Sequence, residues 1–224
     1  MGKIIDVEEY REKTKVFKDR EHAGELLSGQ LSDYKDDPNS IVIAIPAGGV
    51  PVAAKIAFRL RLPLEVAITR KLHVPWNPEA GFGAVTWNDI VEVNQSLANQ
   101  LGLSKTQIEK VIKEEKEVIK KRRKLYGKEE FSDLERKHPI IVDDGLASGF
   151  SMLTTAKAVE RYKPSSITVA IPTAPLSSIE LVEPHVDEIF CLNIRTSRYF
   201  AVASAYENWY DLSDEEVLGY LEKT

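Results

Sequence analysis

A short run of β-branched residues near the middle of the chain ends in two adjacent carboxylates and a loop of small residues. The run, Ile140 to Val142, is apolar without interruption, which indicates a strand buried on both faces of a parallel sheet. The segment from Ser151 onward has the apolar spacing of an amphipathic helix. A buried strand, a small-residue loop and a helix in this order favour an α/β fold.

The loop between this strand and helix carries groups suited to a phosphorylated ligand. Asp143 and Asp144 follow the strand directly, at the end where open α/β sheets bind ligands. Two carboxylates there can hold hydroxyl groups, a hydrated Mg²⁺ ion, or both. In the loop from Gly145 to Gly149, backbone N–H groups and the hydroxyls of Ser148 and Ser151 can converge on a phosphate at the positive helix end. The segment therefore predicts a sugar-phosphate site with a metal.

Composition narrows the class of protein. The 224 residues, 43% hydrophobic and 29% charged, suffice for a full core in one domain. A net charge of -5 argues against a nucleic-acid surface over the whole molecule. The uncharged run Ile41 to Ala54 is too short for a membrane span, and Met1 to Asp6 has no signal-peptide core. With one cysteine, Cys191, we expect a cytoplasmic protein without membrane or nucleic-acid partners.

Apolar runs alternate with helical patterns along the chain. Five runs predict parallel strands: Ile41 to Ile45, Leu64 to Thr69, Pro139 to Val142, Ile167 to Ile171 and Glu188 to Leu192. Strands that regularly alternate with helices predict a doubly wound, mostly parallel five-stranded sheet. We expect a single domain over 1–224, with its core at about 38–195.

Capping residues mark where three of the helices begin. Asp19 can cap a helix that runs to about Tyr34. Ser104 with Gln107 forms a capping box for the longest helix, which ends near Gly127. The last helix repeats this device with the pair Ser213 and Glu216.

Two further segments lie at the predicted ligand edge of the sheet. The loop Pro46 to Gly49 follows the first core strand, and its glycines let backbone N–H groups approach an anion closely. Arg70 and Lys71 follow the second strand, and both side chains suit phosphate oxygens. The segment Leu72 to Asn94 is rich in turn formers and predicts a mobile loop or small hairpin. For the glycine loop, the alternative is a turn needed only for packing. For Arg70 and Lys71, the alternative is a solvated basic pair at the end of a strand.

The basic run KKRRK, Lys120 to Lys124, closes the longest helix. Cations favour a helix C-terminus, and three glutamates lie one or two turns earlier, so we expect a solvated, self-paired helix end. The alternative is that Arg122 or Arg123 reaches the ligand site.

Residues 138–152 resemble the 5-phosphoribosyl-1-pyrophosphate (PRPP) signature of type I phosphoribosyltransferases. In that family a hydrophobic strand precedes an acidic pair, two variable residues and a small-residue loop. The resemblance implies that Asp143 and Asp144 bind the ribose hydroxyls directly or through Mg²⁺, and that Ala147 to Ser151 cradle the 5-phosphate. The implied PRPP-binding loop comprises Gly145, Leu146, Ala147, Ser148, Gly149, Phe150 and Ser151.

The same resemblance extends to the other segments. It implies that Ala47, Gly48 and Gly49 bind pyrophosphate together with Arg70 and Lys71, beneath a loop that closes over it. Arg70, Lys71, Asp143 and Asp144 would then be the catalytic residues. In purine members an aromatic residue after the last strand stacks on the base, and an acidic residue follows seven positions on. Phe200 and Glu207 occupy those places, within a hood made by 1–37 and 196–224, although ordinary core packing is the alternative.

The implied reaction transfers the 5-phosphoribosyl group of PRPP to a nucleobase with Mg²⁺ as cofactor and releases pyrophosphate. A homodimer is expected, with a slight preference for a purine acceptor. Ala147 departs from members that act on 6-oxopurines, which often carry aspartate there, so hypoxanthine and guanine are disfavoured. Adenine, another purine, a pyrimidine and a non-nucleobase amine remain open. The alternative function is a non-catalytic sensor of PRPP or a nucleotide on the same fold.

Overall fold

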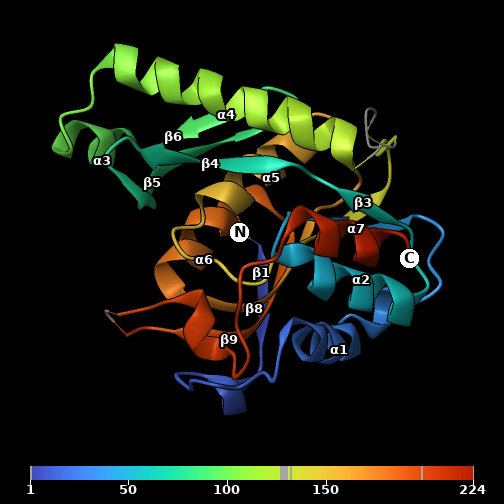
Figure 1. Cartoon of the computed structure of the whole chain (residues 1–224). Helices are drawn as coiled ribbons and strands as arrows, with labels where there is room; N and C mark the ends of the chain where they lie inside the picture. Colours follow the sequence, from blue (N-terminus) through green and yellow to red (C-terminus); the bar gives the residue numbers. More distant parts are fainter. Residues whose placement is uncertain (1, 127–130, 132, 198, 224) are drawn as a thin grey trace.

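A six-stranded, fully parallel sheet lies at the centre of the molecule (Figure 1). The computed structural model describes residues 2–126, 131, 133–197 and 199–223. The strand order is β1-β9-β8-β7-β2-β3. The strands are β1 (Lys3–Asp6), β2 (Ser40–Ala44), β3 (Leu64–Val66), β7 (His138–Val142), β8 (Thr168–Pro175) and β9 (Glu188–Arg195). The predicted doubly wound α/β fold is confirmed.

The sheet has one strand more than the five predicted from the sequence. β1 pairs with β9 in parallel register, from Lys3 opposite Glu188 to Asp6 opposite Cys191. Its four residues are half exposed and begin and end in charged side chains, so they give no continuous apolar signal. The five predicted strands are all present. β3 is shorter than expected because Thr69 already belongs to a second sheet.

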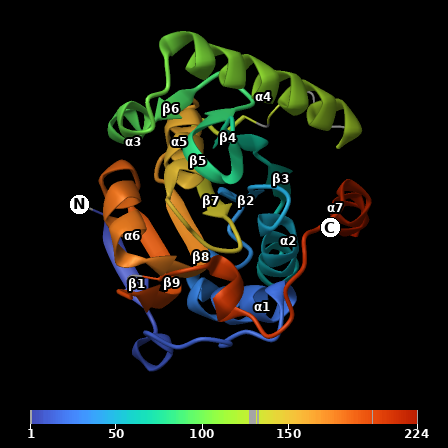
Figure 2. The same cartoon turned by 60° about the vertical axis from the view of Figure 1, so that its left-hand side comes forward.

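Helices cover both faces of the central sheet, which explains the continuous burial of β2 and the burial of β7 after His138. Helices α1 (Arg20–Gln30) and α2 (Gly49–Leu60) pack on one face, and α5 (Phe150–Glu160) and α6 (Leu176–Val182) on the other (Figure 2). Short 3₁₀ helices complete the connections: η1 (Glu8–Tyr10), η2 (Ser32–Tyr34), η3 (Glu183–His185) and η4 (Val202–Ala205).

A smaller antiparallel layer sits beside the carboxyl edge of the central sheet. It consists of β4 (Thr69–Val74), β5 (Asn77–Thr86) and β6 (Val91–Val93), and helices α3 (Gln95–Gln100) and α4 (Lys105–Leu125) cover it (Figure 1). The segment predicted as a loop or small hairpin is thus a hairpin with a third strand added. Because α4 packs on β4, it fixes the strand that carries Arg70 and Lys71.

The predicted helix starts agree with the structure. The Asp19 side chain accepts a hydrogen bond from the His22 backbone N–H, and both serine capping boxes are formed. The first helix ends earlier than expected, at Gln30, and the chain continues through η2 to Tyr34. The longest helix ends at Leu125, and Gly127 lies outside the described residues. The last helix is α7 (Asp214–Leu221).

The segments before α1 and after β9 lie against each other. Phe17 and Tyr206 form a parallel bridge, in which the Phe17 N–H donates to the Ala205 carbonyl and the Glu207 N–H donates to the Phe17 carbonyl. This pairing brings the C-terminal segment back across the carboxyl edge of the central sheet. Among the residues that the structure describes, none of the helices combines the length and apolarity that crossing a membrane requires.

Candidate functional site

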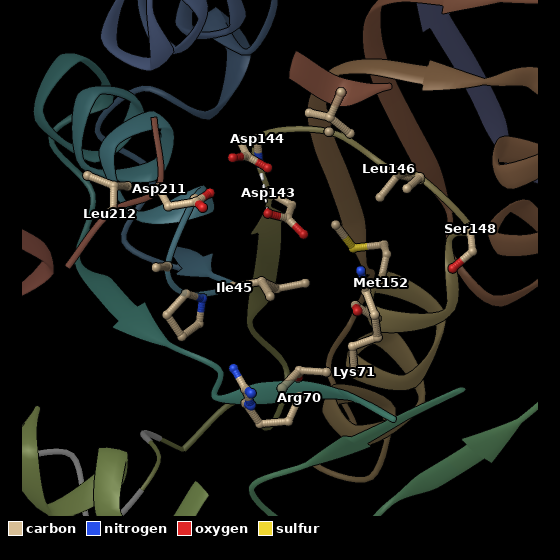
Figure 3. A pocket seen from close by; sticks show the side chains of 18 of the residues that line it. Ile45, Arg70, Lys71, Asp143, Asp144, Leu146, Ser148, Met152, Asp211 and Leu212 are labelled. Carbon is tan, nitrogen blue, oxygen red and sulfur yellow. Dashed lines mark hydrogen bonds between the residues drawn. The ribbon is translucent and has the colours of Figure 1, made fainter. Parts of the chain in front are cut away.

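A cavity of about 570 Å³ opens at the carboxyl edge of the central sheet (Figure 3). The loops after β2 and β7, strand β4, the start of α1 and the C-terminal segment all contribute to its wall. Most of the residues predicted for the site line it: Ala47, Gly48, Arg70, Lys71, Asp143, Asp144, Gly145, Leu146, Ala147, Ser148, Gly149 and Ser151. The sequence pattern therefore brings together segments that are far apart along the chain.

The acidic pair at the end of β7 is tightly bound by its surroundings. Asp143 Oδ1 accepts the Asp144 backbone N–H at 2.8 Å, and Asp144 Oδ2 accepts Arg20 Nε at 2.8 Å. Burial raises the pKa of both carboxyl groups; the charge of Asp144 raises that of Asp143 further, whereas Arg20 opposes the rise at Asp144. The pair therefore favours a cation or hydroxyl donors beside it.

Glycine is required where the loop after β2 meets the acidic pair. A Cβ atom on Gly48 would lie 1.9 Å from Asp144 Oδ2, and one on Gly49 would lie 2.7 Å from the Val142 carbonyl oxygen. Gly49 therefore serves close packing, and it is not among the residues that line the cavity. Gly149 has a φ of 80° at the N-cap of α5, a left-handed conformation that glycine adopts readily.

Two basic residues of β4 lie across the cavity from the acidic pair (Figure 3). Arg70 Nε donates to Glu115 Oε2 of α4 at 2.8 Å, which holds the guanidinium in place. Arg122 of α4 also lines the cavity, with its Nη2 3.2 Å from Asp214 Oδ1. The cavity thus has an acidic side and a basic side, as a ligand with both hydroxyl and phosphate groups requires.

The residues of the basic run at the end of α4 differ in their surroundings, and each of the two alternatives stated above fits one of them. Lys120 pairs with Glu117, as expected of a solvated, self-paired helix terminus. Arg122 instead reaches the cavity wall. Its contact with a ligand stays a prediction.

Arg20 is a highly connected site residue that sequence reasoning missed. Its side chain is 7% exposed, its Nη1 donates to the Tyr210 carbonyl at 2.9 Å, and its Cζ lies 4.0 Å from the centroid of the Trp209 ring. Arg20 is 124 residues from Asp144 in the sequence, so no local pattern marks the pair.

The C-terminal segment forms a further wall of the cavity, and the sequence pattern did not identify the residues that line it. Val202, Trp209, Asp211 and Leu212 line the cavity, and the Asp211 carboxylate points into it (Figure 3). Tyr206 Oη donates to the Asp144 carbonyl at 2.6 Å, and burial raises the pKa of this hydroxyl, which keeps it a donor. The aromatic richness of the stretch was the only signal that could have drawn attention to it.

Besides Gly49, three further predicted residues do not line this cavity. Phe200 lines a neighbouring cavity of about 510 Å³, which shares Ala147 with the first. Glu207 is exposed, and Phe150 in the first turn of α5 is outside the lining. The structure therefore does not bring Phe200 and Glu207 together with the acidic pair, and base stacking by Phe200 stays a prediction.

The carboxylates of the cavity fit a magnesium ion whose remaining ligands are water and substrate oxygens. Within the described ranges, no group of three or more His, Cys, Asp or Glu side chains is arranged to hold a metal. Mg²⁺ commonly binds one or two carboxylates together with waters and phosphate oxygens, so a full protein cage is unnecessary. Asp143 and Asp144 supply such oxygens in a buried setting that a cation would stabilise.

Known proteins are similar to this chain in sequence and in fold. Residues 91–208, more than half of the chain, match the family model of the phosphoribosyl transferase domain. Two curated proteins of Mycobacterium tuberculosis, from strains CDC 1551 and H37Rv and provisionally named phosphoribosyl transferases, are each 30% identical over 212 residues. These residues make up 93% of this chain and 47% of the relatives, so the chain spans about half their length.

A solved structure agrees over nearly the whole chain. TT1426 from Thermus thermophilus is 28% identical and superposes with a TM-score of 0.73, covering 92% of this chain and 98% of that protein. The chain belongs to the phosphoribosyltransferase family.

Proposed function

We propose that the chain transfers the 5-phosphoribosyl group of PRPP to a nucleobase-like acceptor in the presence of Mg²⁺ and releases pyrophosphate. The observation that carries this proposal is the cavity in which the acidic pair, the loop before α5 and the basic residues of β4 meet. Each of the three suits a different part of PRPP: ribose hydroxyls, 5-phosphate and pyrophosphate.

The donor would lie along the loop after β7. Asp143 would accept hydrogen bonds from the ribose hydroxyls, and the loop from Ala147 to Ser151 would receive the 5-phosphate. The first N–H groups of α5 have no partner within the helix, and the macrodipole favours an anion there. The exposed Ser148 hydroxyl adds a donor at the same place.

The pyrophosphate would lie between the loop after β2 and strand β4. Arg70 and Lys71 would neutralise its charge as the bond to the ribose breaks, and Ala47 and Gly48, which line the same cavity, would offer it backbone N–H groups. A magnesium ion at Asp143 and Asp144 would supply further charge neutralisation for the leaving group. The residues of this chain contribute position and charge, which stabilise an oxocarbenium-like transition state.

The acceptor would bind against the C-terminal wall. Val202, Asp211 and Leu212 line the same cavity as the acidic pair, whereas Phe200 lines the neighbouring one. The Asp211 carboxylate can accept a hydrogen bond from an N–H group of the acceptor, and the apolar side chains can contact a planar ring. The terminal segments would then act as the hood, and a purine remains the favoured acceptor.

Pyrophosphate release tests the proposal directly. Purified protein is incubated with PRPP, Mg²⁺ and a panel of purines, pyrimidines and simple amines, and released pyrophosphate is measured for each. Release that depends on one acceptor and on Mg²⁺ supports the transferase. Calorimetric binding of PRPP without pyrophosphate release for any acceptor would instead support a non-catalytic sensor. If the protein neither binds PRPP nor releases pyrophosphate, both the transferase and the sensor are overturned.

A further inference from the structure

Arg20 connects the side chain of Asp144 to the C-terminal wall of the cavity. One edge of its guanidinium donates to Asp144 Oδ2 at 2.8 Å, and another nitrogen donates to the Tyr210 carbonyl at 2.9 Å. Its flat face lies over the Trp209 ring, 4.0 Å from the centroid. A planar fork makes these three contacts at once, which a lysine ammonium cannot do. The acidic pair and the C-terminal wall therefore share one buried cation.

The two carboxylates of the pair have different surroundings. Asp144 is held on three sides: Arg20 binds its carboxylate, Tyr206 binds its carbonyl at 2.6 Å, and Gly48 lies against Oδ2. Two of these contacts lead to the C-terminal segment. Asp143 makes its hydrogen bond within the pair, to the Asp144 N–H. Asp143 is thus the carboxylate placed to meet a ligand, and Asp144 is the one tied to the wall.

We propose that Arg20 is a positioning residue that couples the donor site to the acceptor wall through Asp144. A donor bound at the acidic pair restricts Asp144, and Arg20 passes this restriction to Trp209 and Tyr210. The wall is then already ordered when the acceptor arrives, so bound donor increases the affinity of the protein for the acceptor. Because such coupling is reciprocal, bound acceptor increases the affinity for the donor. The identity of donor and acceptor rests on the proposed function; the connection through Arg20 does not.

Hydrogen exchange without any ligand tests the connection. The Glu207 and Asn208 amides donate to the Phe17 and Lys18 carbonyls, so their exchange reports whether the C-terminal segment is held in place. Asp144→Ala removes the carboxylate far along the chain from these amides, and Arg20→Met removes the cation. We expect each to accelerate exchange at both amides by tenfold or more, and the double variant to add little to either single change. Arg20→Lys should restore only part of the protection.

Asp143→Ala is the matched control, because it removes a neighbouring carboxylate that does not bind Arg20. It should leave exchange at the two amides as in the wild type, and the β8 amides should stay protected in every variant. If Asp144→Ala leaves the two amides fully protected while Arg20→Met exposes them, Arg20 only packs the segment and the proposal is overturned. Equal effects of Asp143→Ala and Asp144→Ala would overturn it as well.

A second arm adds PRPP and Mg²⁺. In the wild type the ligand should slow exchange at Glu207 and Asn208 several-fold, and in Arg20→Met it should not. PRPP binding to the wild type, with no change at these amides, contradicts the coupling. A wild type that fails to bind PRPP by calorimetry contradicts the proposed function instead, and the ligand-free comparison then judges the Arg20 connection by itself.

Discussion

At the scale of single residues, neighbours decide the role of each side chain more than residue type does. Asp143 and Asp144 are identical in chemistry and adjacent in sequence, yet one is bound to Arg20 and the other is not. The sequence predicted the pair and its place at a strand end. It could not separate the two roles, because Arg20 and Asp144 are 124 positions apart in the sequence and meet only in the folded chain.

Asp143→Asn should weaken PRPP binding about tenfold or more, since a hydrogen bond to a charged group contributes about 1.5–3 kcal/mol. The melting temperature should change little, because asparagine keeps an oxygen that can accept the Asp144 backbone N–H. Calorimetry and thermal melting measure the two quantities. Asp33→Asn, an exposed acid on η2, is the control. Wild-type affinity in Asp143→Asn would remove this residue from the site.

Asp211 and Phe200 offer competing predictions for the acceptor. If the acceptor lies against the C-terminal wall, Asp211→Asn raises the acceptor KM several-fold, whereas Phe200→Leu leaves it within about twofold. Steady-state kinetics at saturating PRPP measure both. A raised KM in Phe200→Leu with unchanged kinetics in Asp211→Asn would place the base in the neighbouring cavity, as the family resemblance implied.

At the scale of elements, the strands and helix starts could be predicted because their signals are local. The β-branched run of β7 and the capping boxes at Ser104 and Ser213 are readable within a few residues. β1 has no such signal, since its pairing with β9 supplies the order that its own four residues lack. The choice between Phe200 and Trp209 as the cavity aromatic depends on how the C-terminal segment crosses the sheet. That path is set by its pairing with Phe17.

The loop before α2 should not tolerate a side chain at Gly48. Gly48→Ala places a Cβ against Asp144 Oδ2, so the acidic pair must shift, and PRPP affinity should fall tenfold or more. Gly29→Ala is the control, because a Cβ on this residue of α1 meets nothing within 4 Å. It should raise stability by about 0.5–1 kcal/mol with unchanged PRPP binding. Calorimetry and denaturant unfolding measure these effects, and normal PRPP affinity in Gly48→Ala would show that the pair does not need its present position.

Strand β4 should contribute more to turnover than to donor binding. Replacing Arg70 and Lys71 together by alanine should lower kcat a hundredfold or more, while PRPP affinity falls less than tenfold, because their charge matters most as pyrophosphate departs. Kinetics with the active acceptor and PRPP calorimetry give the two numbers. Equal losses in both would mean that the pair binds the ground state alone.

At the scale of the whole molecule, one cavity draws on segments from α1 to the C-terminal segment, so ligand binding should stabilise the entire fold. A donor concentration 100-fold above its Kd adds about 2.7 kcal/mol to the free energy of unfolding. For a chain of this size that corresponds to a rise of roughly 5–10 °C in melting temperature. Thermal melting with and without PRPP and Mg²⁺ checks this, and the Asp143→Asn variant should show a much smaller rise at the same concentrations. An unchanged wild-type Tm would contradict donor binding. The predicted homodimer stays a prediction at this scale.

The proposed acceptor wall lies beyond the last strand of the central sheet, whereas the proposed donor loops lie between strands. Val202 to Leu212 follow β9, so substitutions there alter no strand register and no crossover connection. The loops after β2 and β7, by contrast, cannot change length without disturbing the elements that flank them. Such an arrangement lets evolution or an engineer vary acceptor choice by exchanging one peripheral segment, provided that Tyr206 and the partners of Arg20 are kept.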